Sequence, residues 1–258
     1  MKNNYNKTQS GRSAGWIAHQ HGGLGVGGSS PLAPTINFFV IVPAYNEERK
    51  IGIFLEELAK IVPLEKVIVI DDGSTDHTYE LAKKTGCIVL KNKINSGKGA
   101  AQKAGFEEAM KRGAEYIITM DADLQHDPAY IPLFIDKLMA GYDIVIGSRW
   151  QELHKMPRDR YLSNRLTTLA ISLLTGRKVM DTQSGFRAIR SEVLKQIQLK
   201  TNKYETESEL LIKALLKGFK VGYVEIEARY GDESSKINRF VDTLRFLRMY
   251  VGLVWQSG

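Results

Sequence analysis

Short apolar runs alternate with helix-like segments over much of the chain. The runs are continuous, which is typical of strands buried on both faces, and they lie at 38–42, 66–70, 87–90, 116–120 and 143–146. Helical periodicity separates them at 47–61, 74–85, 97–112 and 129–140. Because alternating strands and helices form right-handed crossovers, the pattern predicts an α/β fold with a mostly parallel sheet covered by helices on both faces.

The second half of the chain predicts a helix at 159–176, a strand or loop at 181–190, a helix at 204–217, a strand at 223–227 and a helix at 238–255. The first and last of these helices are amphipathic. Their apolar stripes contain Leu162, Leu166, Leu169, Leu173, Phe240, Leu244, Leu247, Val251 and Val254. Packing on a core and lying in a membrane interface explain such stripes equally well.

The domain prediction has three parts. Residues 1–35 are rich in glycine and show no periodicity, so we expect a flexible N-terminal extension there. Residues 36–235 are expected to form the main α/β domain, and 236–258 a C-terminal amphipathic helix. Ser74 or Thr75 is the expected cap of the helix that follows the second strand.

Composition narrows the class of protein. Hydrophobic residues make up 43% and charged residues 25%, as in ordinary globular proteins. The net charge is +7, of which +4 lies beyond residues 1–35, and so mild an excess does not by itself indicate a nucleic-acid partner. Cys87 is the single cysteine, so an internal disulfide is excluded, and we expect it in the core rather than as a nucleophile. No apolar run is long enough to span a membrane.

Acidic residues follow the predicted strands, at the edge where parallel sheets bind ligands. Asp121 and Asp123 are alternate residues and can point the same way. Two close carboxylates repel unless a cation lies between them, and Mg²⁺ shares such oxygens with phosphates. The pattern therefore indicates a metal bridge to a diphosphate, with a solvated acidic loop as the alternative. His126 is expected to be a hydrogen-bonding spacer rather than a ligand, and His77 and His154 to lie on the surface.

Asp71 and Asp72 end the second predicted strand. Either carboxylate can accept a hydrogen bond from a nucleobase or a ribose, and either can instead cap a tight turn. The segment 95–99 resembles a phosphate loop in composition but lacks the P-loop spacing. No Gly-x-Gly-x-x-Gly follows the first strand, which makes a dehydrogenase the weaker hypothesis.

Several ordered motifs together resemble the family 2 glycosyltransferases, which have the GT-A fold. They are Ile41-Val42-Pro43-Ala44-Tyr45-Asn46-Glu47, Asp71-Asp72-Gly73-Ser74, Asn95-Ser96-Gly97-Lys98-Gly99 and Asp121-Ala122-Asp123-Leu124-Gln125-His126. The segments 147–149, 183–187 and 235–236 resemble the branch of dolichol-phosphate mannosyltransferases and polyprenyl-phosphate glycosyltransferases. The resemblance covers about residues 37–245.

The resemblance implies a role for particular residues. Binding of the nucleotide sugar is implied for Pro43, Ala44, Tyr45, Glu47, Asp71, Asp72, Lys98, Asp121, Ala122, Asp123, Arg229 and Lys236. Asp121, Asp123 and Gln125 would hold Mg²⁺ or Mn²⁺, and Arg149 and Arg165 would hold a lipid phosphate. Asp123, Arg149 and Lys236 would act in catalysis.

The expected reaction is a metal-dependent, inverting transfer of a sugar from a nucleoside diphosphate, of the GDP-mannose or UDP-glucose type, to a polyprenyl or dolichyl phosphate. Cations stabilise the charge of the leaving diphosphate, and an anionic phosphate acceptor attacks without a base. A saccharide hydroxyl acceptor would need one, for which Asp181 is the candidate. A nucleotide-sugar-binding protein without catalysis is the third hypothesis. The lipid partner predicts a peripheral location on the cytoplasmic face of a membrane.

Overall fold

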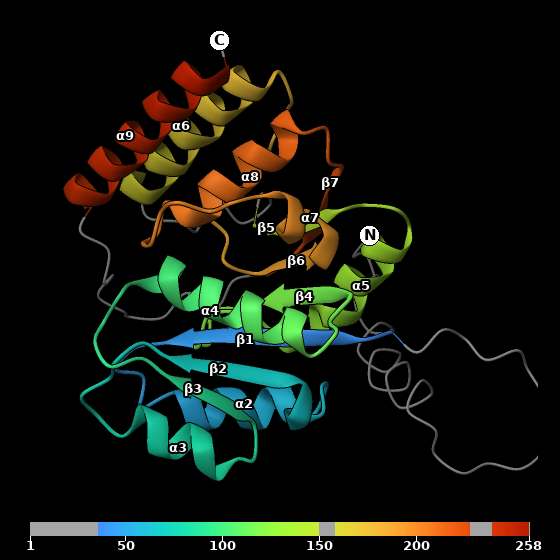
Figure 1. The fold of residues 1–258 in the computed structure, drawn as a ribbon, viewed down its shortest axis with the longest axis vertical. Helices are drawn as coiled ribbons and strands as arrows, with labels where there is room; N and C mark the ends of the chain where they lie inside the picture. Colours follow the sequence, from blue (N-terminus) through green and yellow to red (C-terminus); the bar gives the residue numbers. More distant parts are fainter. Residues whose placement is uncertain (1–35, 150–157, 228–238, 258) are drawn as a thin grey trace, which may run out of the picture.

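The computed structural model describes residues 36–149, 158–227 and 239–257 (Figure 1). A seven-stranded sheet in the order β3-β2-β1-β4-β6-β5-β7 forms its centre. The strands are β1 (Phe38–Ala44), β2 (Val67–Asp71), β3 (Ile88–Lys91), β4 (Tyr116–Thr119), β5 (Ile144–Ser148), β6 (Arg187–Arg190) and β7 (Val221–Glu225). The expected extension at 1–35 and the expected surface residue His154 lie outside the described residues.

The sheet is mostly parallel, as the alternating pattern predicted. β1 runs parallel to β2 and β4, β2 runs parallel to β3, and β5 runs parallel to β7. β6 is antiparallel to both of its neighbours, β4 and β5. Six strands therefore end at one edge of the sheet, and β6 begins there.

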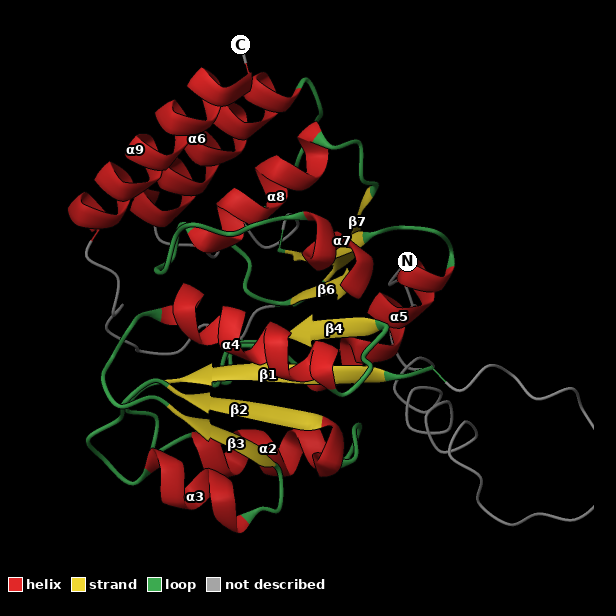
Figure 2. Cartoon of the chain, viewed as in Figure 1, coloured by secondary structure: helices red, strands yellow, loops and turns green. Residues whose placement is uncertain are grey.

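Helices cover both faces of the sheet (Figure 2). They are α2 (Ile51–Ala59), α3 (Thr78–Lys84), α4 (Lys98–Lys111), α5 (Ile131–Met139), α6 (Arg158–Thr175), α7 (Ser191–Gln196), α8 (Thr206–Leu216) and α9 (Arg239–Ser257), with short 3-10 turns η1 (Leu64–Lys66) and η2 (Pro128–Tyr130). In β1, Val40 and Val42 join the core under α2 and α5, whereas Phe39 and Ile41 join the core under α4 and α8. This burial on both faces explains the continuous apolar run.

Two local predictions are wrong. α3 begins at Thr78 after His77, so neither Ser74 nor Thr75 caps it. Instead, the backbone N–H of Asn46 donates to Ser74 Oγ at 2.9 Å, and the N–H of Thr75 donates to Asn46 Oδ1 at 2.9 Å. Ser74 and Thr75 therefore join the segment after β2 to the segment after β1. The sequence pattern also predicted no helix between 190 and 204, where the structure has the short helix α7.

The apolar stripes of α6 and α9 face outward. The two helices lie side by side (Figures 1 and 2), joined by a 3.1 Å hydrogen bond from the Tyr250 hydroxyl to the Ala170 carbonyl. The core receives Ile171 and Leu253 instead, so the core-packing interpretation of the stripes is wrong. The α6/α9 apolar stripe consists of Leu162, Leu166, Leu169, Leu173, Leu244, Leu247, Val251, Val254 and Trp255, each at least 40% exposed. Within the described ranges, no helix is long and apolar enough to cross a membrane.

Candidate active site at the carboxyl edge of the sheet

The predicted acidic residues meet at one edge of the sheet, because the register aligns the strand ends. Ala44 is paired with Asp71, and Ile41 with Thr119, two residues before Asp121. Arg149 directly follows the end of β5. β6 runs the other way, so the segment before it, which contains Asp181 and Gly185, enters at the same edge.

The two carboxylates after β2 have different surroundings. Asp72 Oδ1 accepts from Asn92 Nδ2 at 2.7 Å and from the N–H of Ser96 at 3.0 Å, and its Oδ2 accepts from the N–H of Gly97 at 2.7 Å. Asp72 therefore holds the loop that precedes α4. Asp71 Oδ1 accepts from the N–H of Ser74 at 3.2 Å, and its buried Oδ2 has no hydrogen-bond partner among the described residues. Of the two residues, Asp71 is thus the one whose Oδ2 can still accept a hydrogen bond from a ligand.

Lys98 lies between two carboxylates. Its Nζ is 2.8 Å from Asp121 Oδ1, 2.9 Å from Asp121 Oδ2 and 2.9 Å from Glu207 Oε1. Burial disfavours the ammonium, but these two carboxylates outweigh it and raise the pKa of Lys98 above its ordinary value. Burial likewise opposes the Asp121 carboxylate, and Lys98 outweighs it and lowers the pKa of Asp121. Sequence reasoning missed Glu207, because nothing local in α8 marks it.

Gly99 explains how α8 reaches this position. A Cβ at Gly99 would lie 1.9 Å from Thr206 Oγ1, so the first turns of α4 and α8 approach each other too closely for any side chain there. The glycine therefore serves helix packing. It is this packing that brings Glu207, the second residue of α8, to Lys98, the first residue of α4.

A second glycine touches the Lys98–Asp121 ion pair itself. A Cβ at Gly185 would lie 2.4 Å from Asp121 Oδ2 and 2.9 Å from Lys98 Nζ. The Thr119 hydroxyl donates to the Gly185 carbonyl at 2.6 Å and holds this backbone in place. A residue with a side chain at this position would clash with the Asp121 carboxylate as it is placed in the structure.

The metal ligands implied by the sequence lie on one turn after β4. Asp123 Oδ1 accepts from the N–H of Gln125 at 3.0 Å. Among the described residues no group of three or more His, Cys, Asp and Glu side chains could hold a metal ion. Two carboxylates and an amide oxygen nevertheless fit Mg²⁺ or Mn²⁺, which take oxygen ligands and complete their shell with water and substrate phosphates. The donor set suits a metal shared with a diphosphate better than a closed metal site.

Arg149 and Asp181 form a buried ion pair. Arg149 Nε donates to Asp181 Oδ2 at 2.8 Å and Nη2 to Oδ1 at 2.7 Å, while the N–H of Arg149 donates to Oδ2 at 3.0 Å. Asn164 Nδ2, from α6, adds a further bond to Oδ1 at 3.0 Å. Burial opposes the Asp181 carboxylate, but the bonds and charge of Arg149 outweigh it and lower its pKa. This geometry does not favour Asp181 as a general base, because both oxygens already accept hydrogen bonds.

His126 and Cys87 are both buried. Burial and the nearby charge of Arg149 lower the pKa of His126 to about 4, so the imidazole is neutral at pH 7. Its Nδ1 has no hydrogen-bond partner among the described residues, and its ring centroid lies 5.7 Å from that of Phe186. The predicted hydrogen-bonding role is therefore not seen at Nδ1. Cys87 donates to the Ala82 carbonyl at 3.3 Å and burial raises its pKa, as expected of a core thiol.

The remaining predicted residues are spread around this edge. Ala44 and Ala122 are buried, Pro43 and Glu47 half-buried, and Tyr45 exposed, with the Glu47 N–H bonded to Thr78 Oγ1 at 2.8 Å. Arg165 is exposed on α6, where its Nη1 donates to the Tyr161 hydroxyl at 3.1 Å. Arg229 and Lys236 lie outside the described residues. The exposed position predicted for His77 is confirmed.

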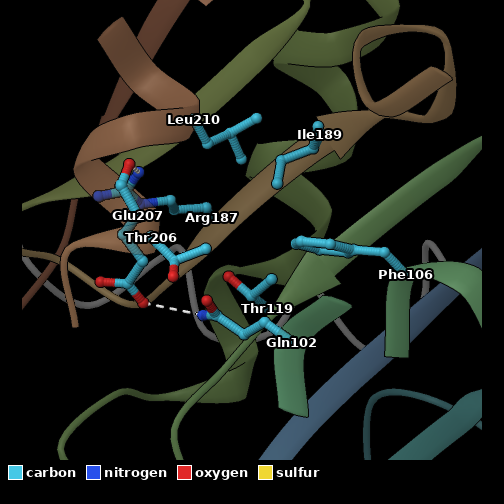
Figure 3. A pocket seen from close by; sticks show the side chains of 8 residues that line it. All are labelled: Gln102, Phe106, Thr119, Arg187, Ile189, Thr206, Glu207 and Leu210. Carbon is cyan, nitrogen blue, oxygen red and sulfur yellow. Dashed lines mark hydrogen bonds between the residues drawn. The ribbon is translucent and has the colours of Figure 1, made fainter. Parts of the chain in front are cut away.

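A small cavity lies beside Glu207 and Gln102, and Thr119 and Arg187 also line it (Figure 3). Its volume is about 10 Å³, near the minimum for one water molecule. The fully buried Arg187 closes one side and donates to the carbonyls of Thr182, Ser184 and Glu207 at 2.7 to 2.8 Å. Arg187 thereby joins the segment before β6 to α8.

The α/β sheet carries acidic side chains at the carboxyl edge, where open sheets of this kind bind ligands. Comparison with known proteins identifies the family. The family model described as "Glycosyl transferase family 2" matches residues 39–198. The chain belongs to this glycosyltransferase family.

Among curated relatives, a UDP-N-acetylglucosamine–dolichyl-phosphate N-acetylglucosaminyltransferase of Methanococcus voltae is 33% identical, over 76% of this chain and 87% of that protein. A polyprenol monophosphomannose synthase of Mycolicibacterium smegmatis is 31% identical, over 76% and 78%. Among solved structures, glucosyl-3-phosphoglycerate synthase of Mycobacterium tuberculosis with Mn²⁺, UDP-glucose and phosphoglyceric acid has a TM-score of 0.68 at 21% identity, covering 85% and 80%. That likeness confirms the predicted GT-A fold.

Proposed function

We propose that the chain transfers a sugar from a nucleoside diphosphate sugar to a polyprenyl phosphate in a metal-dependent reaction. The observation that carries this proposal is the buried pairing of Asp181 with Arg149. Asp181, the candidate base for a hydroxyl acceptor, already accepts hydrogen bonds from Arg149 through both carboxylate oxygens. A phosphate acceptor is anionic near neutral pH and needs no base, so this edge of the sheet suits a phosphate better than an alcohol.

The donor would lie along the strand ends. Asp71 Oδ2 would accept a hydrogen bond from the nucleobase or ribose, since its buried oxygen has no partner within the described structure. Asp121, Asp123 and Gln125 would hold Mg²⁺ or Mn²⁺. The metal, when bound, neutralises negative charge on the diphosphate leaving group. Attack by the phosphate oxygen opposite that leaving group would invert the anomeric carbon.

Positive side chains would hold the acceptor phosphate. Asp181 fixes the orientation of the Arg149 guanidinium, whose positive charge would attract the acceptor phosphate. Arg165 lies on the exposed side of α6, next to Asn164, which contacts Asp181. The names of two relatives, one a dolichyl-phosphate transferase and one a polyprenol monophosphomannose synthase, support a lipid phosphate as acceptor. Arg229 and Lys236 remain predicted contributors.

The test measures nucleotide release from GDP-mannose, UDP-glucose and UDP-N-acetylglucosamine in detergent, with and without Mn²⁺ or Mg²⁺. Each donor is offered a polyprenyl phosphate and, as the matched control, the polyprenol without its phosphate. We expect release that requires both metal and lipid phosphate, with one preferred donor. Equal release with the free polyprenol would contradict a phosphate acceptor, and metal-independent release would contradict the metal.

We also propose that the α6/α9 apolar stripe lies on a membrane surface, beside the lipid substrate. The stripe is exposed and includes leucines of both helices, and Arg245 and Arg248 are exposed on α9. Such helices bind anionic interfaces through buried apolar area and charge together. The position of Asn164 on α6 joins this surface to the Arg149–Asp181 pair.

Substitution on the stripe is expected to weaken membrane binding. Leu166→Gln with Leu169→Gln should lower partitioning onto vesicles containing anionic lipids by about tenfold, because two leucines lose their burial in the interface. Leu133→Gln is the matched control, since Leu133 is similarly exposed on α5 and lies outside the stripe. Equal co-sedimentation of both variants and the unaltered chain would refute the proposal. A dimer disrupted by the stripe substitutions would instead assign the surface to a second copy.

A further inference from the structure

Lys98 forms an ion pair with Asp121, the carboxylate that would bind a metal in the proposed function. Its ammonium contacts both oxygens of Asp121, at 2.8 Å and 2.9 Å. A divalent cation bound by Asp121 would lie within a few ångströms of that ammonium, and like charges so close repel strongly at a half-buried site. The ammonium and a metal ion therefore compete for Asp121.

Glu207 is the second carboxylate that contacts the Lys98 ammonium. Its Oε1 lies 2.9 Å from Lys98 Nζ. The same oxygen accepts a hydrogen bond from Gln102 Nε2 at 2.9 Å (Figure 3). The Glu207 backbone carbonyl accepts from the buried Arg187 Nη1 at 2.7 Å. These contacts do not involve Asp121. Glu207 is thus held in place whatever Asp121 binds.

We propose that Lys98 is an internal counter-ion of Asp121, which a metal displaces, and that Glu207 is the positioning residue that retains the displaced ammonium. This inference rests on the proposed metal-dependent function. Without Glu207, displacement would leave a buried ammonium with no carboxylate partner at this position, which is costly. With Glu207, the ammonium keeps one ion pair and can turn toward the donor diphosphate.

The arrangement couples the metal to the donor. In the free protein, a metal must first displace Lys98 from Asp121, so it binds weakly. A nucleoside diphosphate gives the displaced ammonium a new anionic partner, which favours metal binding. By thermodynamic linkage, the metal must favour the nucleotide by the same factor.

The test measures Mn²⁺ affinity of the full chain by electron paramagnetic resonance, without nucleotide and with UDP or GDP, and needs no turnover. Without nucleotide, Lys98→Met should bind Mn²⁺ about tenfold more tightly than the unaltered chain, because the competitor is gone. Glu207→Gln should bind it about tenfold more weakly, because the ammonium has lost its second carboxylate. Lys98→Arg should stay close to the unaltered chain, since it keeps the positive charge.

Two controls separate this mechanism from a general effect of charge. Lys103→Met removes the same charge from the same helix, where Lys103 binds Asn202, and should leave Mn²⁺ affinity within about twofold. In the Lys98→Met background, Glu207→Gln should change affinity less than about twofold, because Glu207 acts through Lys98. If Glu207 acted only through its negative charge, Glu207→Gln would weaken Mn²⁺ binding at least as much in the Lys98→Met background as in the unaltered chain.

The outcomes distinguish the two proposals. If the unaltered chain binds Mn²⁺ but Lys98→Met binds it equally or more weakly, the counter-ion inference is overturned and the metal-dependent function stands. The positioning role of Glu207 is overturned if Glu207→Gln has the same effect with and without Lys98. If the unaltered chain binds no Mn²⁺ under any of these conditions, the metal dependence itself fails and the inference fails with it.

Discussion

Asp181→Asn is expected to lower the free energy of unfolding by about 3 kcal/mol, because the change leaves the buried charge of Arg149 without its counter-ion. Asparagine keeps the shape and part of the hydrogen bonding, so the loss reports mainly the charge. Urea denaturation followed by circular dichroism measures it, through a lower midpoint at an unchanged slope. A fall in turnover would accompany it, because Arg149 would lose its fixed orientation.

The paired variant is the control for this prediction. Arg149→Met combined with Asp181→Leu removes both charges and should be more stable than Asp181→Asn alone, since no uncompensated charge stays buried. A paired variant as unstable as the single one would show that the ion pair is not the cause.

The same ion pair predicts a dependence of stability on pH. The pKa of Asp181 is lowered in the folded protein, so its contribution is complete above the ordinary carboxyl pKa of about 4 and is lost as the pH falls through the lowered value. The stability difference between the unaltered chain and Asp181→Asn should thus be constant from about pH 5 to 8 and shrink below about pH 4. A difference that grows in acid would contradict the assignment.

Gly185→Ala is expected to reduce turnover by about a hundredfold while the chain stays folded. The added Cβ would lie 2.4 Å from Asp121 Oδ2, so the carboxylate or the backbone held by Thr119 must move. A displacement of about 1 Å at a catalytic group costs roughly this factor in rate. The thermal midpoint should fall as well, because overpacking costs about 1 to 3 kcal/mol.

Gly52→Ala is the matched control for the glycine substitution. A Cβ at Gly52 meets no atom within 4 Å, and alanine favours the helix α2, so turnover should not change and stability should rise slightly. Normal turnover and Mn²⁺ affinity of Gly185→Ala would refute the claim that this backbone determines the position of Asp121.

The sheet could be predicted from the sequence because its strands are buried on both faces. Val40 and Phe39 are adjacent and belong to opposite cores, which produces a run without polar interruption. The place of Asp121 followed from the same reasoning, since a carboxylate after a parallel strand lies at the ligand-binding edge. The motifs then predicted a family 2 glycosyltransferase, and the family match confirms that prediction.

The partners of these residues could not be predicted, because they come from distant parts of the chain. Glu207 contacts Lys98 only because Gly99 lets α8 pack against α4. The spacing of these residues along the sequence does not predict that contact. The sequence did not distinguish the roles of Asp71 and Asp72. Only the structure shows that Asp72 accepts hydrogen bonds from the loop before α4. For α6, periodicity identified the apolar stripe but not its direction, since Ile171 faces the core while Leu169 faces outward.

The reversed strand β6 has a consequence for how the chain folds during synthesis. β6 lies between β4 and β5, and β5 is paired only with β6 and β7 among the described strands. A nascent chain that ends after β5 therefore lacks the strand that joins β5 to β4, and the β4 edge of the sheet formed by β1 to β4 stays open. β5 can therefore join the rest of the sheet only after β6, which ends at residue 190, has been synthesised.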